Sequence, residues 1–238
     1  MKALRGDADQ APDRPIVVKV SGRLLSPPRP QYLRRLREAL WRSADIRPVA
    51  VVTGGGPLSR EYIAALRELE VPEALLDVMG INAARLNALS LALALYPRSP
   101  PRPMVTLEEA LEALSRSFIP VLGGLQPGQS TNAVALSLAE ALRAEVVVNM
   151  LSGVAGVYNP PPGREGSRLL ERVSYEEMES LISQFPQLAG TYELLDRVAL
   201  QIAMRSKVRV LFVNGEEPSV VERVSRGERV VGTLMGPL

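Results

Sequence analysis

The sequence of 238 residues contains no cysteine and no histidine, and only 4% of its residues are aromatic. Without cysteine and histidine the chain has no disulfides, no zinc site built from these residues, no cysteine nucleophile and no histidine-based triad or general base. Any catalysis must therefore use lysine, arginine, carboxylates, hydroxyls, backbone amides or a hard metal ion held by oxygen atoms. The scarcity of aromatics also predicts a core of mainly aliphatic side chains.

A strong excess of charge of either sign is also missing. Lysine and arginine number 28 and aspartate and glutamate 26, which leaves a net charge of +2. The sequence contains no run of five like charges, so we expect a mixed, solvated surface and no nucleic-acid partner. Hydrophobic residues make up 46% of the chain, which is ample for a folded core.

Long apolar runs are absent as well. Stretches such as residues 88–95 are too short to cross a bilayer, so we expect no membrane partner. Residues 1–15 lack the continuous apolar segment of a secretory signal. We interpret them as a flexible leader before a single domain over residues 16–238, and we expect the protein to be cytoplasmic.

Candidate strands and helices alternate along the chain. Short runs rich in β-branched residues predict buried strands over residues 16–20, 48–53, 118–122, 145–150, 208–213 and 229–234. Helical spacing, with capping boxes that begin at residues 106, 174 and 219, predicts helices over residues 31–43, 59–69, 72–95 (one or two), 106–116, 131–141, 174–185, 192–205 and 219–225. This alternation predicts an α/β fold with a mostly parallel sheet that helices cover on both faces.

Glycine-rich turns follow three of the predicted strands. They are Ser21-Gly22, Gly54-Gly55-Gly56 and the longer segment of residues 123–131. In an open parallel sheet these turns meet at the carboxyl edge of the strands, where ligands bind. Glycine lets the backbone approach an anion closely, and the start of a helix offers free N–H groups. One such turn alone is compatible with an ordinary tight turn, but three at successive strand ends favour a site for several phosphates, and hence for nucleotides.

Neither of two common phosphate-binding motifs is present. The sequence has no G-x-x-x-x-G-K-[ST] loop and no G-x-G-x-x-G at the first strand. Lys19, however, lies within the otherwise apolar first strand, where an unpaired charge is costly. It either reaches water at the mouth of the sheet or points at a phosphoryl group that is being transferred. Phosphoryl transfer needs mainly positioning and positive charge, so it requires no histidine.

Six segments of the sequence carry patterns that occur together in one known family. They are residues 19–22 (KVSG), 52–56 (VTGGG, followed by Arg60 and Tyr62), 76–81 (LDVMGI), 85–88 (RLNA), 124–131 (GLQPGQST) and 189–196 (AGTYELLD). Together they resemble the archaeal type of UMP kinase (uridylate kinase), which belongs to the amino-acid kinase superfamily. The resemblance covers nearly the whole chain from residue 16 onward.

The resemblance implies a fold, a reaction and an assembly. The fold is a three-layer αβα sandwich in which residues 16–143 bind UMP and residues 144–238 bind ATP. The reaction transfers the γ-phosphoryl group of ATP to UMP, gives UDP for pyrimidine nucleotide biosynthesis and uses Mg²⁺, with no metal ligand implied among the protein's own residues. The assembly is a homohexamer built as a trimer of dimers.

The resemblance also implies roles for individual residues. Its catalytic set is Lys19, Arg60 and Asp196, in which Lys19 neutralises the transferred phosphoryl group and Asp196 orients Lys19 through an ion pair. Its UMP site, in which Asp77 accepts from the ribose hydroxyls, is Gly55, Asp77, Gly124, Leu125, Gln126, Pro127, Gly128, Gln129, Ser130 and Thr131. Its ATP site is Gly22, Arg23, Gly56, Arg60, Ser152, Gly153, Tyr158 and Pro161. Two further residues, Arg85 and Asn87, belong either to a subunit contact or to the surroundings of UMP.

The sequence departs from the family pattern in the segment implied to bind ATP. The family's T-N-V-D-G-V-Y-x-x-D reads S-G-V-A-G-V-Y-N-P-P over residues 152–161, which removes two carboxylates and one amide. In addition, Asn132 takes the place of an acid. We therefore expect UMP binding to be kept and ATP binding to be weakened or altered. Two alternatives stay open: a catalytically weak relative that binds uridine nucleotides as a sensor or partner subunit, and a kinase for another small phosphate or carboxylate acceptor.

Overall fold

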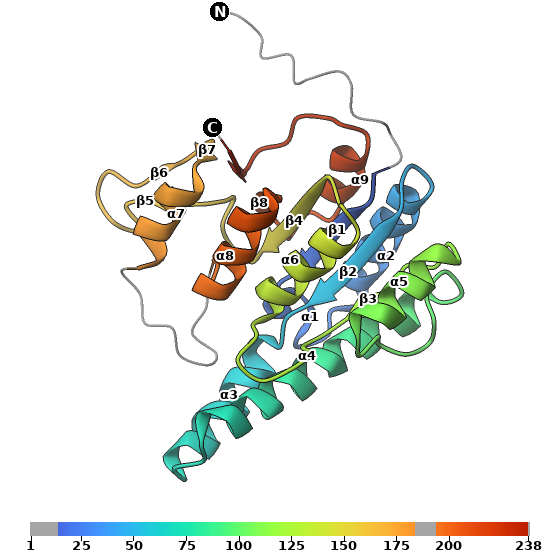
Figure 1. The fold of residues 1–238 in the computed structure, drawn as a ribbon, viewed down its shortest axis with the longest axis horizontal. Coiled ribbons are helices and arrows are strands. Elements are labelled where there is room, and N and C mark those ends of the chain that lie inside the picture. Colours follow the sequence, from blue (N-terminus) through green and yellow to red (C-terminus); the bar gives the residue numbers. More distant parts are fainter. Residues whose placement is uncertain (1–13, 184–193, 238) are drawn as a thin grey trace, which may run out of the picture.

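The computed structural model describes residues 14–183 and 194–237 of the chain. Seven strands form one sheet in the order β3-β2-β1-β4-β8-β9-β7 (Figure 1). Their bounds are β1 Ile16–Val20, β2 Val49–Thr53, β3 Val121–Leu122, β4 Val146–Leu151, β7 Arg172–Val173, β8 Arg209–Asn214 and β9 Thr233–Met235. The neighbouring strands are parallel except for β8 and β9, so the prediction of a mostly parallel sheet is confirmed. A separate ribbon pairs β5 Tyr158–Asn159 with β6 Arg168–Leu169.

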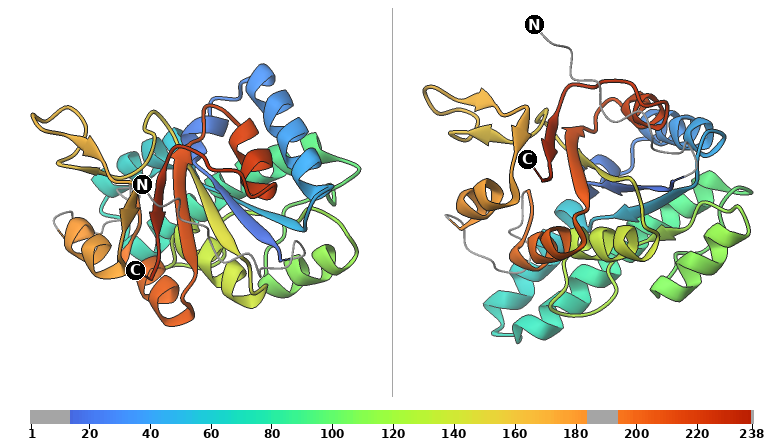
Figure 2. Two further views of the ribbon diagram at one scale, coloured as in Figure 1. Left: turned by 90° about the horizontal axis from the view of Figure 1, so that it is seen from above. Right: turned by 45° about the horizontal axis from the view of Figure 1, so that its top comes forward.

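Helices cover both faces of this sheet, as two turned views make clear (Figure 2). One face is covered by α5 Leu107–Ser115, α6 Thr131–Ala141, α7 Tyr175–Ile182 and α8 Arg197–Ser206. The opposite face is covered by α1 Gly22–Leu25, α2 Pro30–Ala44, α4 Glu73–Leu95 and α9 Ser219–Ser225. Alongside α4 lies α3 Gly56–Glu68, and this pair projects from the body of the molecule (Figure 1). The three-layer αβα arrangement is thereby confirmed.

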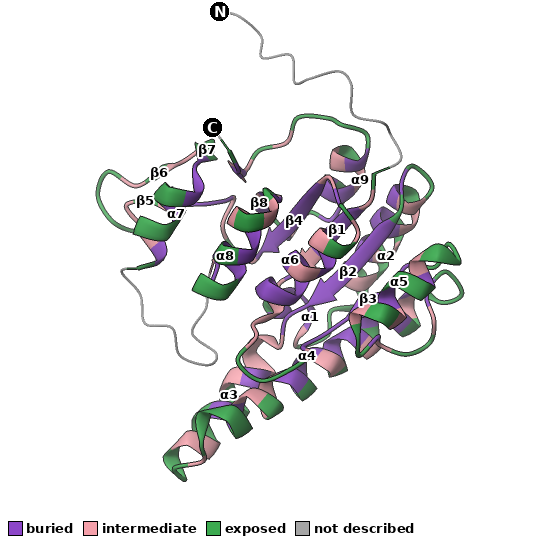
Figure 3. Ribbon diagram, in the orientation of Figure 1, coloured by how far each residue is buried: buried purple, intermediate pink, exposed green. Residues whose placement is uncertain are grey.

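The central strands are buried on both faces, which explains why their sequences are continuous β-branched runs (Figure 3). Every residue of β2 and β4 is buried. In β1, Val17 packs toward α6 and α8, whereas Ile16 and Val18 pack toward α2 and α4. Polar residues interrupt this apolar pattern only near the carboxyl ends of the strands, at positions such as Lys19 and Asn149.

Several elements differ in extent from the sequence-based expectations. Residues 72–95 give one unbroken helix, and α3 begins at Gly56 rather than at residue 59, because Pro57 suits the first turn of a helix. The strand expected over residues 229–234 lies at Thr233–Met235, and β3 keeps only two residues. Residues 184–185 and 192–193 of two expected helices lie outside the described residues, and α8 begins after Asp196. The elements α1, β5, β6 and β7 are two to four residues long and were not predicted.

The three predicted capping boxes have different outcomes. The box over residues 174–177 is complete, with both reciprocal hydrogen bonds formed. The box over residues 106–109 is half formed, because the carboxylate of Glu109 accepts from the N–H of Val105 instead. The third box is wrong: α9 has no side-chain cap, and the hydroxyl of Ser219 donates to a neighbouring carboxylate.

By length and composition alone, α4 is the one helix among the described residues that would be able to cross a membrane. Helices in the core of a globular protein share this length and composition. In this fold Ala88, Leu91, Ala92 and Leu95 of α4 are fully buried against the sheet. Packing therefore explains the apolar residues on the side of this helix that contacts the sheet.

Candidate active site

The turns that follow β1, β2 and β3 meet at one edge of the sheet and enclose a cleft. Its walls are formed by Lys19, Ser21, Gly22, Arg23, Gly54, Gly55, Gly56, Ser59, Arg60, Ile63, Asp77, Gly80, Ile81, Gly124, Gln129, Ser130, Thr131 and Asn132. Because β1 pairs with β2 and β2 with β3, the three turns come from adjacent strands. The position of the cleft at the carboxyl edge follows from this order of parallel strands.

The first two turns pack backbone against backbone. A Cβ atom on Gly22 would lie 2.2 Å from the nitrogen of Gly56 and 2.5 Å from the oxygen of Gly54. Gly56 has a φ of +67°, which other residues rarely adopt. Both α1 and α3 begin at these turns, so the free N–H groups of two helices open on the cleft. This arrangement is suited to bind phosphate groups.

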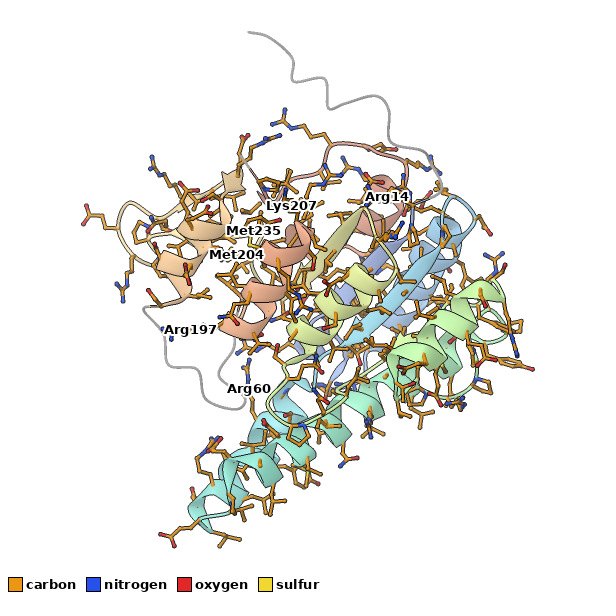
Figure 4. The ribbon with its side chains drawn as sticks, viewed as in Figure 1. Arg14, Arg60, Arg197, Met204, Lys207 and Met235 are labelled. Atoms are coloured by element: carbon orange, nitrogen blue, oxygen red, sulfur yellow. The ribbon has the colours of Figure 1, made fainter. Side chains whose placement is uncertain are left out.

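The side chain of Lys19 reaches the cleft from the fourth position of β1. Burial lowers the pKa of its ammonium to about 8, against an opposing effect of the Asp196 carboxylate and with a further lowering by the Arg60 guanidinium. The ammonium is therefore still charged at neutral pH. Arg60 lies at the start of α3, toward the same end of the molecule as Arg197 at the start of α8, whereas Lys207 ends α8 on the opposite side (Figure 4).

Two side chains of α4 hold the loop that follows β3. The guanidinium of Arg85 donates to the carbonyl oxygens of Gly124 at 3.0 Å and Leu125 at 3.2 Å. About two turns of the helix closer to its start, an oxygen of Asp77 accepts the N–H of Gly128 at 2.8 Å. The loop is thus fixed to the same helix at two points.

A third residue of α4, Asn87, holds the second glycine turn. It is 6% exposed, and its Nδ2 donates to the carbonyl oxygens of Gly54 at 2.8 Å and Gly55 at 3.2 Å. The structure thereby places both Asn87 and Arg85 against the turns that line the cleft.

The floor of the site is formed by the beginnings of α6 and α8. Ser130 caps α6 by accepting the N–H groups of Asn132 and Ala133, each at 3.1 Å, and its hydroxyl donates to Asp196. Asp196 in turn caps α8 by accepting the N–H of Ala199 at 3.0 Å. The carboxylate acts on Lys19 through space, and no direct ion pair joins the two among the described residues. Asp196 is 5% exposed and lies behind the cleft lining rather than in it.

The residues implied to bind UMP lie on or beside the cleft. Its lining contains Gly55, Asp77, Gly124, Gln129, Ser130 and Thr131. The remaining four belong to the same loop outside the lining, namely Leu125, Gln126, Pro127 and Gly128. Sequence reasoning quoted Gly80 and Ile81 only within the segment of residues 76–81 and gave them no role, although helical spacing puts them on the same face of α4 as Asp77. It missed Ser59 and Ile63 of α3, which also line the cleft.

The residues implied to bind ATP fall into two groups. Those in the cleft lining are Gly22, Arg23, Gly56 and Arg60. Those on the segment after β4, outside the lining, are Ser152, Gly153, Tyr158 and Pro161. Gly153 has a φ of +79°, and a Cβ atom there would meet nothing within 4 Å. This left-handed conformation suits glycine and, less well, asparagine, so glycine in place of the family's asparagine keeps the turn.

Known sequences resemble this chain over most of its length. The sequence model described as the amino acid kinase family matches residues 14–214. A uridylate kinase of Aeropyrum pernix is 51% identical over 217 residues, which are 90% of this chain and 96% of the relative. A uridylate kinase of Hyperthermus butylicus is 42% identical over 227 residues, 94% of this chain and 100% of the relative.

Solved structures agree with this relationship. The crystal structure of the uridylate kinase of Archaeoglobus fulgidus superposes with a TM-score of 0.81 at 33% identity, over 93% of this chain and 99% of that one. The UMP kinase of Bacillus anthracis has a TM-score of 0.75 at 21% identity, over 95% and 97% of the two chains, and supports the fold alone. From the family match, the relatives and the arrangement of the cleft, the chain belongs to the amino acid kinase family, among its archaeal uridylate kinases.

Proposed function

We propose that the protein is a UMP kinase, which transfers the γ-phosphoryl group of ATP to UMP and forms UDP. The observation that carries this proposal is the 51% identity to a uridylate kinase over almost the whole of both chains. The cleft supports it, because Lys19 and two helix starts converge there on a space between glycine turns. In this proposal residues 16–143 bind UMP and residues 144–238 contribute the ATP side.

On the acceptor side, the UMP phosphate lies against the turn at Gly55 and the loop of residues 124–131. Asp77 accepts hydrogen bonds from the ribose hydroxyls. Its carboxylate already accepts the N–H of Gly128 on one oxygen, and it retains acceptor capacity for a ligand. The phosphate of UMP is bound by N–H groups and hydroxyls, which suit an anion that must stay nucleophilic.

In the transfer step, an oxygen of the UMP phosphate attacks the γ-phosphorus of ATP while the bond to the β,γ-bridging oxygen breaks and ADP leaves. The attacking oxygen is anionic at neutral pH, so no general base is needed, in keeping with the absence of histidine. Lys19 and Arg60 stabilise the negative charge on the transferred group. Asp196 attracts the ammonium of Lys19 and holds Ser130 at the start of α6.

On the donor side, the ATP phosphates lie over Gly22, Arg23 and Gly56, and the segment of residues 152–161 meets the nucleoside. Among residues 14–183 and 194–237 there is no group of three acidic side chains that could hold a metal ion. Mg²⁺ usually keeps several water ligands and is held largely by substrate phosphates, so it would enter this site together with ATP and would supply further positive charge to the phosphates.

We further propose that the protein is cytoplasmic and self-associates, with the homohexamer as the expected form. Although α4 is a core helix, it leaves Leu75, Val78, Leu86 and Leu93 exposed by 58, 42, 54 and 53%. Their spacing places these four side chains on one side of the helix. Such a stripe is the kind of surface that a second copy of the chain would cover, and light scattering of the purified protein tests this.

The function is tested by calorimetric titration with UMP and then with Mg·ATP, followed by a UDP assay on the same sample. The proposal expects both nucleotides to bind and UDP to form, with Lys19→Ala stopping turnover and sparing UMP binding. If UMP binds but ATP does not and no nucleoside triphosphate yields UDP, the protein is a uridine nucleotide-binding relative whose changed segment over residues 152–161 has ended catalysis. Competition between UMP, CMP and carbamate tests the acceptor.

A further inference from the structure

A buried polar side chain lies next to Lys19, and the roles proposed above leave it unused. Asn149, the fourth residue of β4, is 1% exposed in an otherwise apolar strand. In the parallel register of β1 and β4, Asn149 is the partner of Lys19. Neighbouring strands lie about 4.8 Å apart and register partners project to the same face of the sheet, so the two side chains rise side by side.

A chain of two hydrogen bonds, which begins at a backbone carbonyl and passes through Asn132, fixes the orientation of the Asn149 amide. Asn132, in the first turn of α6, donates through Nδ2 to the oxygen of Leu194 at 3.2 Å, which leaves its Oδ1 to face Asn149. Asn149 donates through its own Nδ2 to that Oδ1 at 3.5 Å. An amide carries oxygen and nitrogen on opposite sides, so the Oδ1 of Asn149 points away from Asn132. This oxygen is buried, and no described residue donates a hydrogen bond to it.

Lys19 has the hydrogen-bond donors that the Oδ1 of Asn149 lacks. Its ammonium offers three donors and no acceptor, and among residues 14–183 and 194–237 it forms no hydrogen bond. The charged groups that act on it from neighbouring elements are the Asp196 carboxylate at the start of α8 and the Arg60 guanidinium on α3. Neither fixes the direction in which the ammonium points, because each acts through space.

We propose that Asn149 is a positioning residue, whose Oδ1 accepts a hydrogen bond from the Lys19 ammonium and holds it toward the phosphoryl group. The inference rests on the proposed kinase function. An amide oxygen is a neutral acceptor, so it orients the ammonium and leaves its positive charge intact. A carboxylate in the same place would neutralise that charge. Asn132 has a part in this arrangement, because a carboxylate at position 132 would be unable to donate to the Leu194 oxygen.

Direct observation of Lys19 provides the test. The sequence contains three lysines, Lys2, Lys19 and Lys207. The ¹³C NMR spectrum of the full-length chain labelled at lysine therefore contains few side-chain signals, and the signal of Lys19 can be followed against pH. We would measure the pKa of Lys19, kcat, and the KM for UMP with Mg·ATP in the wild type and in Asn149 variants. Asn149→Leu keeps the branched shape of the side chain, with somewhat more volume, but removes the acceptor: the pKa of Lys19 should fall and kcat should drop about 10–100-fold, with KM changed less than about twofold.

Asn149→Asp keeps an acceptor and adds a negative charge, so it should raise the pKa of Lys19. Opposite shifts in the two variants are a result that a general packing defect does not produce. Ser43→Ala is the matched control, because it removes another buried polar group, whose hydroxyl bonds the oxygen of Ala39 within α2. It should leave the pKa of Lys19 and kcat unchanged.

The outcomes separate this inference from the proposed function. An unchanged Lys19 pKa and kcat in folded Asn149→Leu would overturn the positioning role even if the wild type makes UDP. Opposite pKa shifts in a wild-type background that makes no UDP would uphold the contact with Lys19 and reject the kinase. If Asn149→Leu does not fold, the smaller Asn149→Ala replaces it, because it removes the same acceptor, and a Lys19 pKa and a kcat equal to those of the wild type would then overturn the proposal.

Discussion

Replacing Lys19 by methionine should stabilise the fold while it stops catalysis. Methionine has a similar length and no charge, so Lys19→Met removes an ammonium that the folded state holds in a partly buried place. The neighbouring Asp196 keeps its own hydrogen bonds from Ser130 and Ala199, so the substitution does not leave a carboxylate without partners. A residue that catalysis needs thus lowers the free energy of unfolding, as is common for active sites.

The size of the gain follows from the pKa of Lys19. At about 1.36 kcal/mol per pKa unit, the fall from 10.5 to about 8 corresponds to roughly 3 kcal/mol. Because the ammonium lines an open cleft, water and salt screen part of this, and the buried Oδ1 of Asn149 loses its proposed donor, so we expect a net gain of about 1 kcal/mol at pH 7. For a domain of this size that raises Tm by about 2–4 °C.

The dependence on pH supplies the sharper test. Below pH 8 the ammonium is charged in both states, so the folded wild type bears the whole penalty. Above pH 8 the folded state releases the proton more readily than the unfolded state, and the penalty disappears as the pH approaches 10.5. Urea unfolding of Lys19→Met and wild type should therefore give a difference that shrinks between pH 7 and pH 10. Lys207→Met, at an exposed position, is the control and should show little gain.

A stability difference that is absent, reversed or independent of pH would refute this reasoning about Lys19. The measurement needs no substrate, so it stands whether or not the nucleotides bind.

Four further predictions follow from the contacts around the cleft. The kcat/KM for UMP should decline as pH rises through about 8, where Lys19 loses its charge in the free protein, and a rate that stays flat to pH 9.5 would contradict this. Asp77→Asn should weaken UMP binding about 10–100-fold and leave Mg·ATP binding unchanged by calorimetry, because a charged acceptor for the ribose is lost. Gly56→Ala should destabilise the fold by about 2–4 kcal/mol in urea unfolding, because φ is +67° and a Cβ atom would lie 2.5 Å from Gly22; an equal stability would mean that the turns separate easily. Arg85→Ala should raise the Kd for UMP about 5–20-fold and speed hydrogen exchange of the loop from Gly124, since two charge-assisted hydrogen bonds disappear; unchanged exchange would show that the loop needs no support from α4.

Much of the fold is predictable because its signals are local. Buried parallel strands require continuous β-branched runs, and those runs mark β1, β2, β4 and β8 to within about two residues. The helix starts were less certain, because a cap depends on the backbone that precedes it. At residue 219 the pattern of a capping box is present, but the helix is already preceded by Pro218 in a helical conformation, so Ser219 has no cap position to fill.

The site was predictable only in part, for a physical reason. The glycine turns follow strands, so their convergence at one edge is a consequence of the parallel order. The side chains that hold those turns come from elsewhere: Asn87 and Arg85 bond carbonyl oxygens more than 30 residues away. Nothing in the spacing of α4 identifies such a partner, and the same holds for Asn149, whose importance comes from its register with Lys19.

The contact between Gly22 and Gly56 has a consequence for the width of the cleft. The two turns touch through main-chain atoms, so their spacing depends on the backbones that follow β1 and β2 and not on side-chain rotamers. The strands β1 and β2 pair over five residues, and this pairing supports the spacing from below. The width of the cleft at this point is thereby a main-chain property, and a single methyl group added at either glycine would push the two turns apart.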